Sequence, residues 1–165
     1  MKSFYIKQKF ISLKDDFYVY NENEKQVYKI DGSFMKVPKT FTIYDKEHNE
    51  RAHIERKPLS LLPTFIVEVE QSYQFKIKKQ LSLFKARYSI EGEGVEVKGN
   101  FWDMDFTVEL NGREIGKVSK EWLSLGDIYK IDVFDEAWEM IVITLVVAID
   151  RVKEEKHTLW AITDF

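Results

Sequence analysis

An aromatic residue followed two positions later by an aliphatic one recurs six times along the chain, and this repeat limits the possible fold more than any other feature. The aromatic positions are separated by 24, 24, 23, 18 and 23 residues. Because residues two apart on a strand share a face, each pair marks one buried face of a strand. The six pairs are Phe17/Val19, Phe41/Ile43, Phe65/Val67, Tyr88/Ile90, Phe106/Val108 and Tyr129/Ile131.

Turn-like residues follow five of these pairs, and a second strand ending in an aliphatic residue follows each turn. Asn111-Gly112 is the strongest of these hairpin signals. A second repeated pattern, Lys-x-aliphatic-Ser-Leu, begins at Lys9, Lys57 and Lys79. The repeat therefore predicts about twelve strands over residues 4–134, joined as consecutive antiparallel hairpins. A meander of this size tends to close into a barrel, because closure removes the unpaired strand edges.

The stretch from Trp138 to Ile149 differs, because it holds one charged residue in twelve. Periodicity alone does not separate a buried strand from a buried helix here. The absence of Gly and Pro from Asp135 to Lys156 favours a helix over about 136–155. A membrane span needs about 20 apolar residues, so this helix has to be buried within the protein. A barrel of about twelve strands has an interior wide enough to hold it.

The sequence thus predicts a mainly β protein, a closed antiparallel barrel around a central hydrophobic C-terminal α-helix, with residues 1–165 as one domain. In this arrangement we expect Leu145 and Val146 to be deeply buried. A tail over 157–165 follows the helix and carries four large apolar residues. Two interpretations remain open for the tail, packing against the barrel or a contact surface for self-association or a partner protein. The four residues are Leu159, Trp160, Ile162 and Phe165.

Four segments of the chain, in order, resemble the bacterial branch of the LURP-one-related family, in the tubby C-terminal-like group with the phospholipid scramblases. These segments are Lys9-Phe10-Ile11-Ser12-Leu13, Gly99-Asn100-Phe101-Trp102, Ser119-Lys120-Glu121-Trp122-Leu123 and Leu145-Val146-Val147-Ala148-Ile149-Asp150-Arg151-Val152. The resemblance implies a twelve-stranded barrel with a hydrophobic C-terminal helix through its centre. Tubby proteins bind phosphoinositides and scramblases are linked to calcium-dependent lipid movement, so lipid binding is the expectation that the resemblance adds.

Composition and motifs limit the classes of function that this chain can have. The chain has no cysteine, which excludes a disulfide framework, a thiolate nucleophile and cysteine-ligated zinc. No nucleophile elbow, phosphate loop or dinucleotide motif occurs, so we expect neither catalysis nor a cofactor.

The net charge of −3 is unevenly spread, with 17 Lys and Arg against 11 Asp and Glu in residues 1–87. This half of the chain is mildly basic, but it lacks the concentrated positive charge of a nucleic-acid-binding protein. We expect a cytoplasmic protein without a secretory signal.

Two groups of charged residues are candidate binding sites. Cations on adjacent strands can hold the phosphates of an anionic lipid headgroup, and the alternative is that they only keep the barrel soluble. The cationic candidates are Lys76, Lys78, Lys79, Lys85 and Arg87. The acidic residues before the helix, Asp132, Asp135 and Glu136, are weak calcium candidates, since they lack an alternating Asp/Asn run with a central Gly. Their charge also suits a helix N-terminus.

The sequence therefore predicts a non-enzymatic binding module that reaches anionic membrane phospholipids through a basic barrel face and would then be peripheral to the membrane. The alternative is a soluble scaffold or protein-interaction domain that does not bind lipid.

Overall fold

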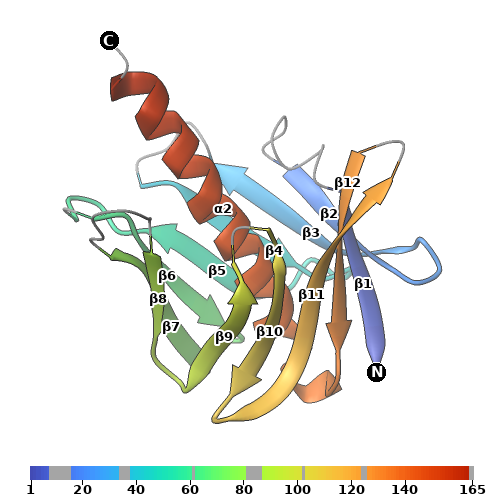
Figure 1. Ribbon diagram of the computed structural model, residues 1–165. Coiled ribbons are helices and arrows are strands. Elements are labelled where there is room, and N and C mark those ends of the chain that lie inside the picture. Colours follow the sequence, from blue (N-terminus) through green and yellow to red (C-terminus); the bar gives the residue numbers. More distant parts are fainter. Residues whose placement is uncertain are drawn as a thin grey trace.

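The computed structural model describes the backbone of residues 1–7, 16–33, 38–60, 62–80, 87–101, 103–123 and 126–163. These residues form an antiparallel sheet of twelve strands in the order β8-β7-β6-β5-β4-β3-β2-β1-β12-β11-β10-β9, curved around one long helix (Figure 1). The strands are β1 (Lys2–Lys7), β2 (Asp16–Asn21), β3 (Gln26–Ser33), β4 (Thr40–Tyr44), β5 (Glu50–Arg56), β6 (Thr64–Val69), β7 (Tyr73–Gln80), β8 (Arg87–Glu91), β9 (Val95–Asn100), β10 (Asp105–Leu110), β11 (Arg113–Leu123) and β12 (Gly126–Val133).

The aromatic–aliphatic repeat forms the inner face of the barrel. Cross-strand pairs such as Phe65 with Ile77 and Phe41 with Ile54 place these side chains side by side, and all four are at most 2% exposed. The alternate residues of the same strands point outward, because side chains alternate across a sheet. Of the six predicted pairs, Tyr88 lies outside the described side chains and its partner Ile90 is partly buried.

The barrel is nearly closed rather than completely closed. Among the described residues, β8 and β9 are consecutive strands but form the two edges of the sheet. Their connection holds three successive residues at positive φ, Gly92, Glu93 and Gly94. Gly92 lies against the β7 backbone, where a Cβ would be 2.9 Å from the Gln74 carbonyl oxygen, and the Asn111 amide donates to the Gly94 carbonyl. The connection is therefore fixed between two neighbouring hairpins.

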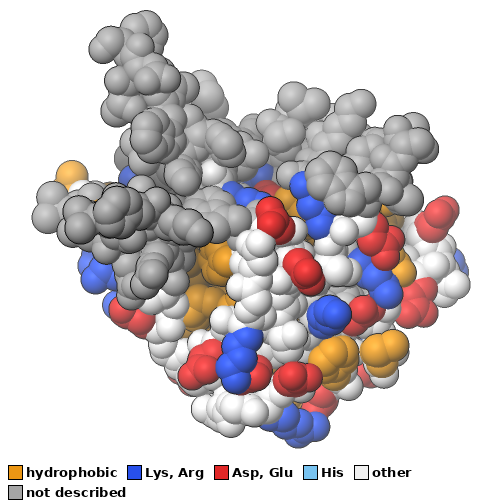
Figure 2. Space-filling view, viewed as in Figure 1, with side chains coloured by type: hydrophobic (Ala, Val, Ile, Leu, Met, Phe, Trp, Pro, Cys, Tyr) orange, Lys and Arg blue, Asp and Glu red, His pale blue; other side chains and the backbone are white. Residues whose placement is uncertain are grey.

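Hydrophobic side chains remain visible at this seam (Figure 2). Ile90 of β8 and Val97 of β9 are the partly buried residues there that pack on the core.

The hydrophobic segment is the central helix that the sequence predicts. Asp135 caps a short 3-10 helix, η1 (Glu136–Trp138), by accepting a hydrogen bond from the Ala137 amide, and α2 (Glu139–Thr163) follows directly. Every residue from Met140 to Val152 is buried, with Leu145 and Val146 at 0% exposure, as expected. The predicted end near residue 155 is wrong, since α2 continues to Thr163. No Gly or Pro interrupts this stretch, and the segment expected to be a separate tail from residue 157 extends the same helix.

The two ends of the barrel differ. The short hairpin turns at 22–25, 45–49, 70–72, 92–94 and 111–112 lie at the end where the helix begins, which we call the lower mouth (Figure 1). The connections from β5 to β6 and from β9 to β10 lie at the opposite end, the upper mouth, where α2 leaves the barrel (Figure 1). Within the described part of the chain, no helix has the length and apolar character needed to cross a membrane.

Candidate anion-binding surface

A hollow of about 370 Å³ lies on the outer wall next to the upper mouth and gathers three lysines. Lys76 and Lys78 point outward from β7, and Lys57 follows the end of β5. Their three side chains are exposed. The structure thus brings together two of the cationic residues selected from the sequence and adds Lys57, which sequence reasoning did not select. The remaining described residues that line the hollow are Ser60, Leu62, Thr64 and Glu91.

The connection between β5 and β6 shapes one side of this hollow. The Lys57 amide donates to the Thr64 carbonyl at 2.8 Å, which closes the connection at its base. The Ser60 hydroxyl donates to the Lys57 carbonyl at 3.2 Å and the Thr64 hydroxyl to the Leu62 carbonyl at 3.1 Å. Thr64 is also the cross-strand partner of Lys78. The fold therefore places Lys57 beside Lys78, although they are 21 positions apart in the sequence.

Among the described residues, the lysines of this hollow have no carboxylate partner, in contrast to several other cations of the barrel. Elsewhere, Lys29 lies 2.6 Å from Asp31, Lys98 lies 2.8 Å from Glu109, and Lys130 lies 3.4 Å from Asp132. These contacts raise the pKa of all three lysines, chiefly through the hydrogen bond in Lys29 and Lys98 and through charge attraction in Lys130.

Across the described residues, by contrast, no carboxylate comes within 4.0 Å of the lysine ammonium groups at 57, 76 and 78. Glu91 is the cross-strand partner of Lys76 and the one carboxylate among the described lining residues. The face that carries β9, β10 and β11 shows acidic and basic side chains intermixed (Figure 2). The hollow thus has three lysines against one described carboxylate, which leaves an excess of positive charge.

The other cationic candidates lie outside the described part of the chain. This is true of Lys85 as a whole and of the side chains of Lys79 and Arg87, whose backbones belong to β7 and β8. The side chains of Leu159, Trp160 and Ile162, and Phe165 as a whole, are likewise not described. Their proposed roles stay predictions.

The three weak calcium candidates each have a separate partner. Asp132 accepts a hydrogen bond from the Ser3 hydroxyl at 2.5 Å, and Asp135 caps η1 and lies 3.2 Å from Arg113. Glu136 lies 3.0 Å from the Lys2 ammonium group. No group of three acidic or histidine side chains suited to a metal ion occurs among the described residues. Asp135 and Glu136 thus make contacts at the start of the helix, whereas Asp132 connects β12 to β1.

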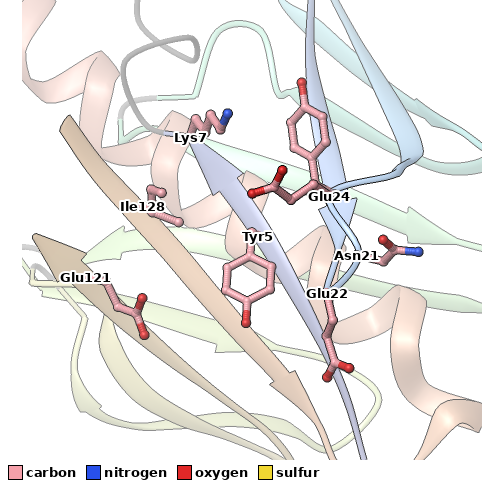
Figure 3. Close-up of a pocket in the computed structure, with 8 residues that line it drawn as sticks. Tyr5, Lys7, Asn21, Glu22, Glu24, Glu121 and Ile128 are labelled. Carbon is pink, nitrogen blue, oxygen red and sulfur yellow. The ribbon is translucent and has the colours of Figure 1, made fainter. Parts of the chain in front are cut away.

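A second hollow of about 320 Å³ lies on the outer wall where β1 separates from β2. β1 pairs with β12 at six positions but with β2 at two, Phe4 with Asn21 and Tyr5 with Tyr20. Figure 3 shows Tyr5 and Lys7 on β1, with Glu121 on one side and Glu22 and Glu24 on the other. Lys7 lies over the Tyr20 ring, 5.4 Å from its centroid. This hollow is acidic and does not suit an anion.

A third hollow, also about 320 Å³, lies at the lower mouth, and the acidic and basic side chains that line it balance one another. The Tyr28 hydroxyl donates to the Glu139 carboxylate, and Lys2 lies 3.8 Å from the same carboxylate. Burial and this hydrogen bond raise the pKa of the Tyr28 hydroxyl well above its usual range. Arg51 pairs with Asp45 and Glu70. These contacts connect the helix start to the wall and leave little net charge for a ligand.

Comparison with known proteins agrees with the fold and with the resemblance found in the sequence. A family model described as LURP-one-related matches residues 2–150. The chain belongs to the LURP-one-related family. The match ends inside α2, at Asp150.

Two proteins that are similar to this LURP-one-related chain are informative. It is similar to "Uncharacterized protein YxjI" of Bacillus subtilis (strain 168), with 28% identity over 152 residues that cover 92% of this chain and 94% of YxjI. It also resembles a crystal structure of an Arabidopsis thaliana protein, with 12% identity, a TM-score of 0.61, and coverage of 92% of this chain and 90% of the plant chain. The second likeness shows that the LURP-one-related barrel with its helix is shared at the level of the fold.

Proposed function

We propose that this LURP-one-related protein is a binding module that holds the phosphate groups of anionic phospholipids in the lysine hollow formed by Lys57, Lys76 and Lys78. One observation carries the proposal: three exposed lysines line a single hollow, and no described carboxylate lies within 4.0 Å of their ammonium groups. Like charges at close range repel one another, so an isolated protein gains nothing from this cluster. An anion in the hollow removes the repulsion.

The chemistry of the hollow defines what it selects. An ammonium group is a compact point charge that lacks the planar fork of a guanidinium, so it recognises charge more than shape. The hydroxyls of Ser60 and Thr64 donate to backbone carbonyls, which leaves the lysines as the side-chain donors. We therefore expect headgroups to be ranked by their negative charge, with little preference for one stereochemistry.

The number of lysines limits the strength of binding. A basic residue near an anionic membrane contributes about 1 kcal/mol, so three contribute about 3 kcal/mol. Micromolar binding needs about 8 kcal/mol. The hollow alone thus gives weak, reversible and salt-sensitive attachment, as in a peripheral protein that needs a second contact.

Co-sedimentation with vesicles tests this function. Neutral phosphatidylcholine vesicles are compared with vesicles that contain about a third of phosphatidylserine or phosphatidic acid, over a salt series. We expect binding to the anionic vesicles alone, and a loss of most of it in Lys76→Gln/Lys78→Gln. The matched control is Lys25→Gln/Lys117→Gln, which removes two exposed lysines on other parts of the barrel. Equal loss in both double variants, or no binding by the wild type, would reject the proposal.

A scaffold that holds a partner protein is the second candidate function, favoured by the continuation of α2 to Thr163. The end of this helix stands clear of the sheet (Figure 1). Its sequence includes Leu159, Trp160 and Ile162, with Phe165 beyond it. If this end is a contact surface, the wild type will associate with increasing concentration, and a chain ending at residue 156 will remain monomeric in analytical ultracentrifugation.

A further inference from the structure

We propose that Leu59, at the tip of the turn between β5 and β6, inserts into the bilayer while the lysine hollow holds the headgroups. This inference rests on the proposed function, and it adds how the protein is oriented on the membrane and what supplies the second contact. In this orientation the upper mouth faces the lipid and the lower mouth faces away from it.

Leu59 is the most exposed large hydrophobic residue that the structure describes, with a relative exposure of 102%. The other two in this class are Met1, at the chain terminus, and Phe134, which is 40% exposed at the lower mouth. A single exposed leucine is ordinary on a protein surface. Leu59 is unusual because it is the one exposed large hydrophobic residue among the described non-glycine residues with a positive φ, and because it lies beside the lysine hollow.

The backbone of Leu59 has a φ of +58°, in the left-handed region that Gly and Asn adopt more readily. Leucine is therefore an unfavourable choice at this point of the turn. Complete exposure means that burial within this chain does not compensate for the unfavourable conformation. An apolar environment outside the chain would compensate for it, because it removes the leucine side chain from water.

The same turn connects the leucine to the cations. Lys57 and Ser60, on either side of Leu59, both line the lysine hollow. The hydrogen bonds from the Ser60 hydroxyl to Lys57 and from the Lys57 amide to Thr64 fix the turn against β6. Lys78 is opposite Thr64, and Lys76 is two residues further from the mouth, about 7 Å along the strand. The apolar tip thus extends from the upper mouth, and the cations are arranged beside and behind it.

This arrangement matches the layers of an anionic membrane. Lysines at the level of the phosphates and one apolar side chain beyond them give the two signals that lasting peripheral attachment requires. A protein partner fits less well, because a stable protein interface buries about 800 Å² on each side, far more than one leucine offers. The excess of positive charge beside the leucine also complements an anionic bilayer more directly than it complements a second copy of this chain.

The absence of cysteine in this chain allows a direct test. Leu59→Cys and Phe134→Cys each give one attachment site for an environment-sensitive NBD fluorophore, one at the upper mouth and one at the lower mouth. With vesicles that contain phosphatidylserine, we expect a blue shift and an increase in emission at position 59 and no change at position 134. A similar response at both positions, or at neither position while the protein is bound, would overturn the orientation.

Binding by an unlabelled variant completes the test. Leu59→Gly removes the side chain and suits the positive φ, so the turn is preserved. We expect it to bind anionic vesicles about ten- to a hundredfold more weakly than the wild type, with an unchanged dependence on salt. If Leu59→Gly binds normally while Lys76→Gln/Lys78→Gln does not, insertion is wrong and the headgroup function stands. If the wild type does not bind, the proposed function itself fails. Emission changes at position 59 that depend on protein concentration without vesicles would indicate a second copy as the partner.

Discussion

The hydroxyl of Tyr129 on β12 donates a hydrogen bond of 3.0 Å to Oδ1 of Asp150 on α2, inside the barrel. Asp150 also lies 2.5 Å from the Arg151 guanidinium, which is 5.7 Å from the Phe17 ring centroid and 5.6 Å from that of Phe41. All three polar residues are at most 4% exposed. This network connects the wall to the helix, and the cost of burying these charges makes its completeness important.

Removal of the tyrosine hydroxyl should therefore destabilise the fold. Tyr129→Phe leaves the buried Asp150 carboxylate with one hydrogen bond fewer, and we expect a loss of about 1–3 kcal/mol in the free energy of unfolding. Urea unfolding measures this loss in the free energy of unfolding. Tyr44→Phe, at a half-buried tyrosine on the outer side of the barrel, is the control and should change stability by less than about 0.5 kcal/mol. Equal stabilities of the two variants would show that the hydrogen bond contributes little.

The central helix provides the sharpest test of the architecture. Leu145 is completely buried, and Leu145→Ala should cost about 2–5 kcal/mol through lost contacts and the cavity that remains. Leu145→Asp should prevent folding, because a carboxylate would be buried there without a partner. Circular dichroism and urea unfolding are sufficient to compare them. Soluble and cooperatively folded Leu145→Asp protein would contradict the position of the helix.

Gly116 lies at a close approach of the wall to the helix. A Cβ at this position of β11 would be 2.8 Å from Cγ1 of Val142 and 3.0 Å from the Asp132 carbonyl oxygen. We expect Gly116→Ala to destabilise the protein by about 1–3 kcal/mol through overpacking. Gly116→Ala/Val142→Ala should recover part of that loss, which a double-mutant cycle in urea can show. Additive effects of the two substitutions would mean that Val142 is not the obstacle.

The inner face of the barrel could be predicted from the sequence, because pairs such as Phe65 and Val67, or Phe41 and Ile43, recur at the spacing of successive hairpins. The exposure of Leu59 could not be predicted from the sequence. Its segment, Lys57-Pro58-Leu59-Ser60-Leu61, has the same pattern as Lys79-Gln80-Leu81-Ser82-Leu83, so the pattern alone does not show that Leu59 is exposed. The turn closed by the Lys57–Thr64 hydrogen bond determines this for Leu59, and turn geometry depends on contacts that a repeat does not encode.

The candidate site was predicted in part for a related reason. Lys76 and Lys78 share a face by strand periodicity, which a sequence shows directly. Lys57 joins them only because β6 places Thr64 opposite Lys78. The gap between β8 and β9 was also missed, since closure is the ordinary outcome for a long meander. The gap coincides here with three consecutive positive φ values, at Gly92, Glu93 and Gly94.

Stability should decrease at alkaline pH, in part through Tyr28. Burial, followed by the hydrogen bond to Glu139, raises the pKa of this hydroxyl in the folded protein, while the unfolded chain keeps a value near 10. Above about pH 10 the unfolded state binds fewer protons, so the free energy of unfolding falls as pH rises towards the folded pKa. We expect this decrease between pH 9.5 and pH 11 in urea titrations and a shallower one in Tyr28→Phe. An unchanged slope in Tyr28→Phe would assign the alkaline loss to other groups, such as the ion-paired lysines.

The salt dependence of vesicle binding tests the central claim most directly. The logarithm of the partition coefficient on phosphatidylserine vesicles is measured against the logarithm of salt concentration for the wild type and for Lys57→Gln/Lys76→Gln/Lys78→Gln. If the three lysines neutralise lipid phosphates, the wild type will bind more weakly as salt increases, and the triple variant will show a much shallower slope with weaker binding at low salt. Identical slopes for the two proteins would contradict the account, because the lysine hollow would then not be where the membrane is bound.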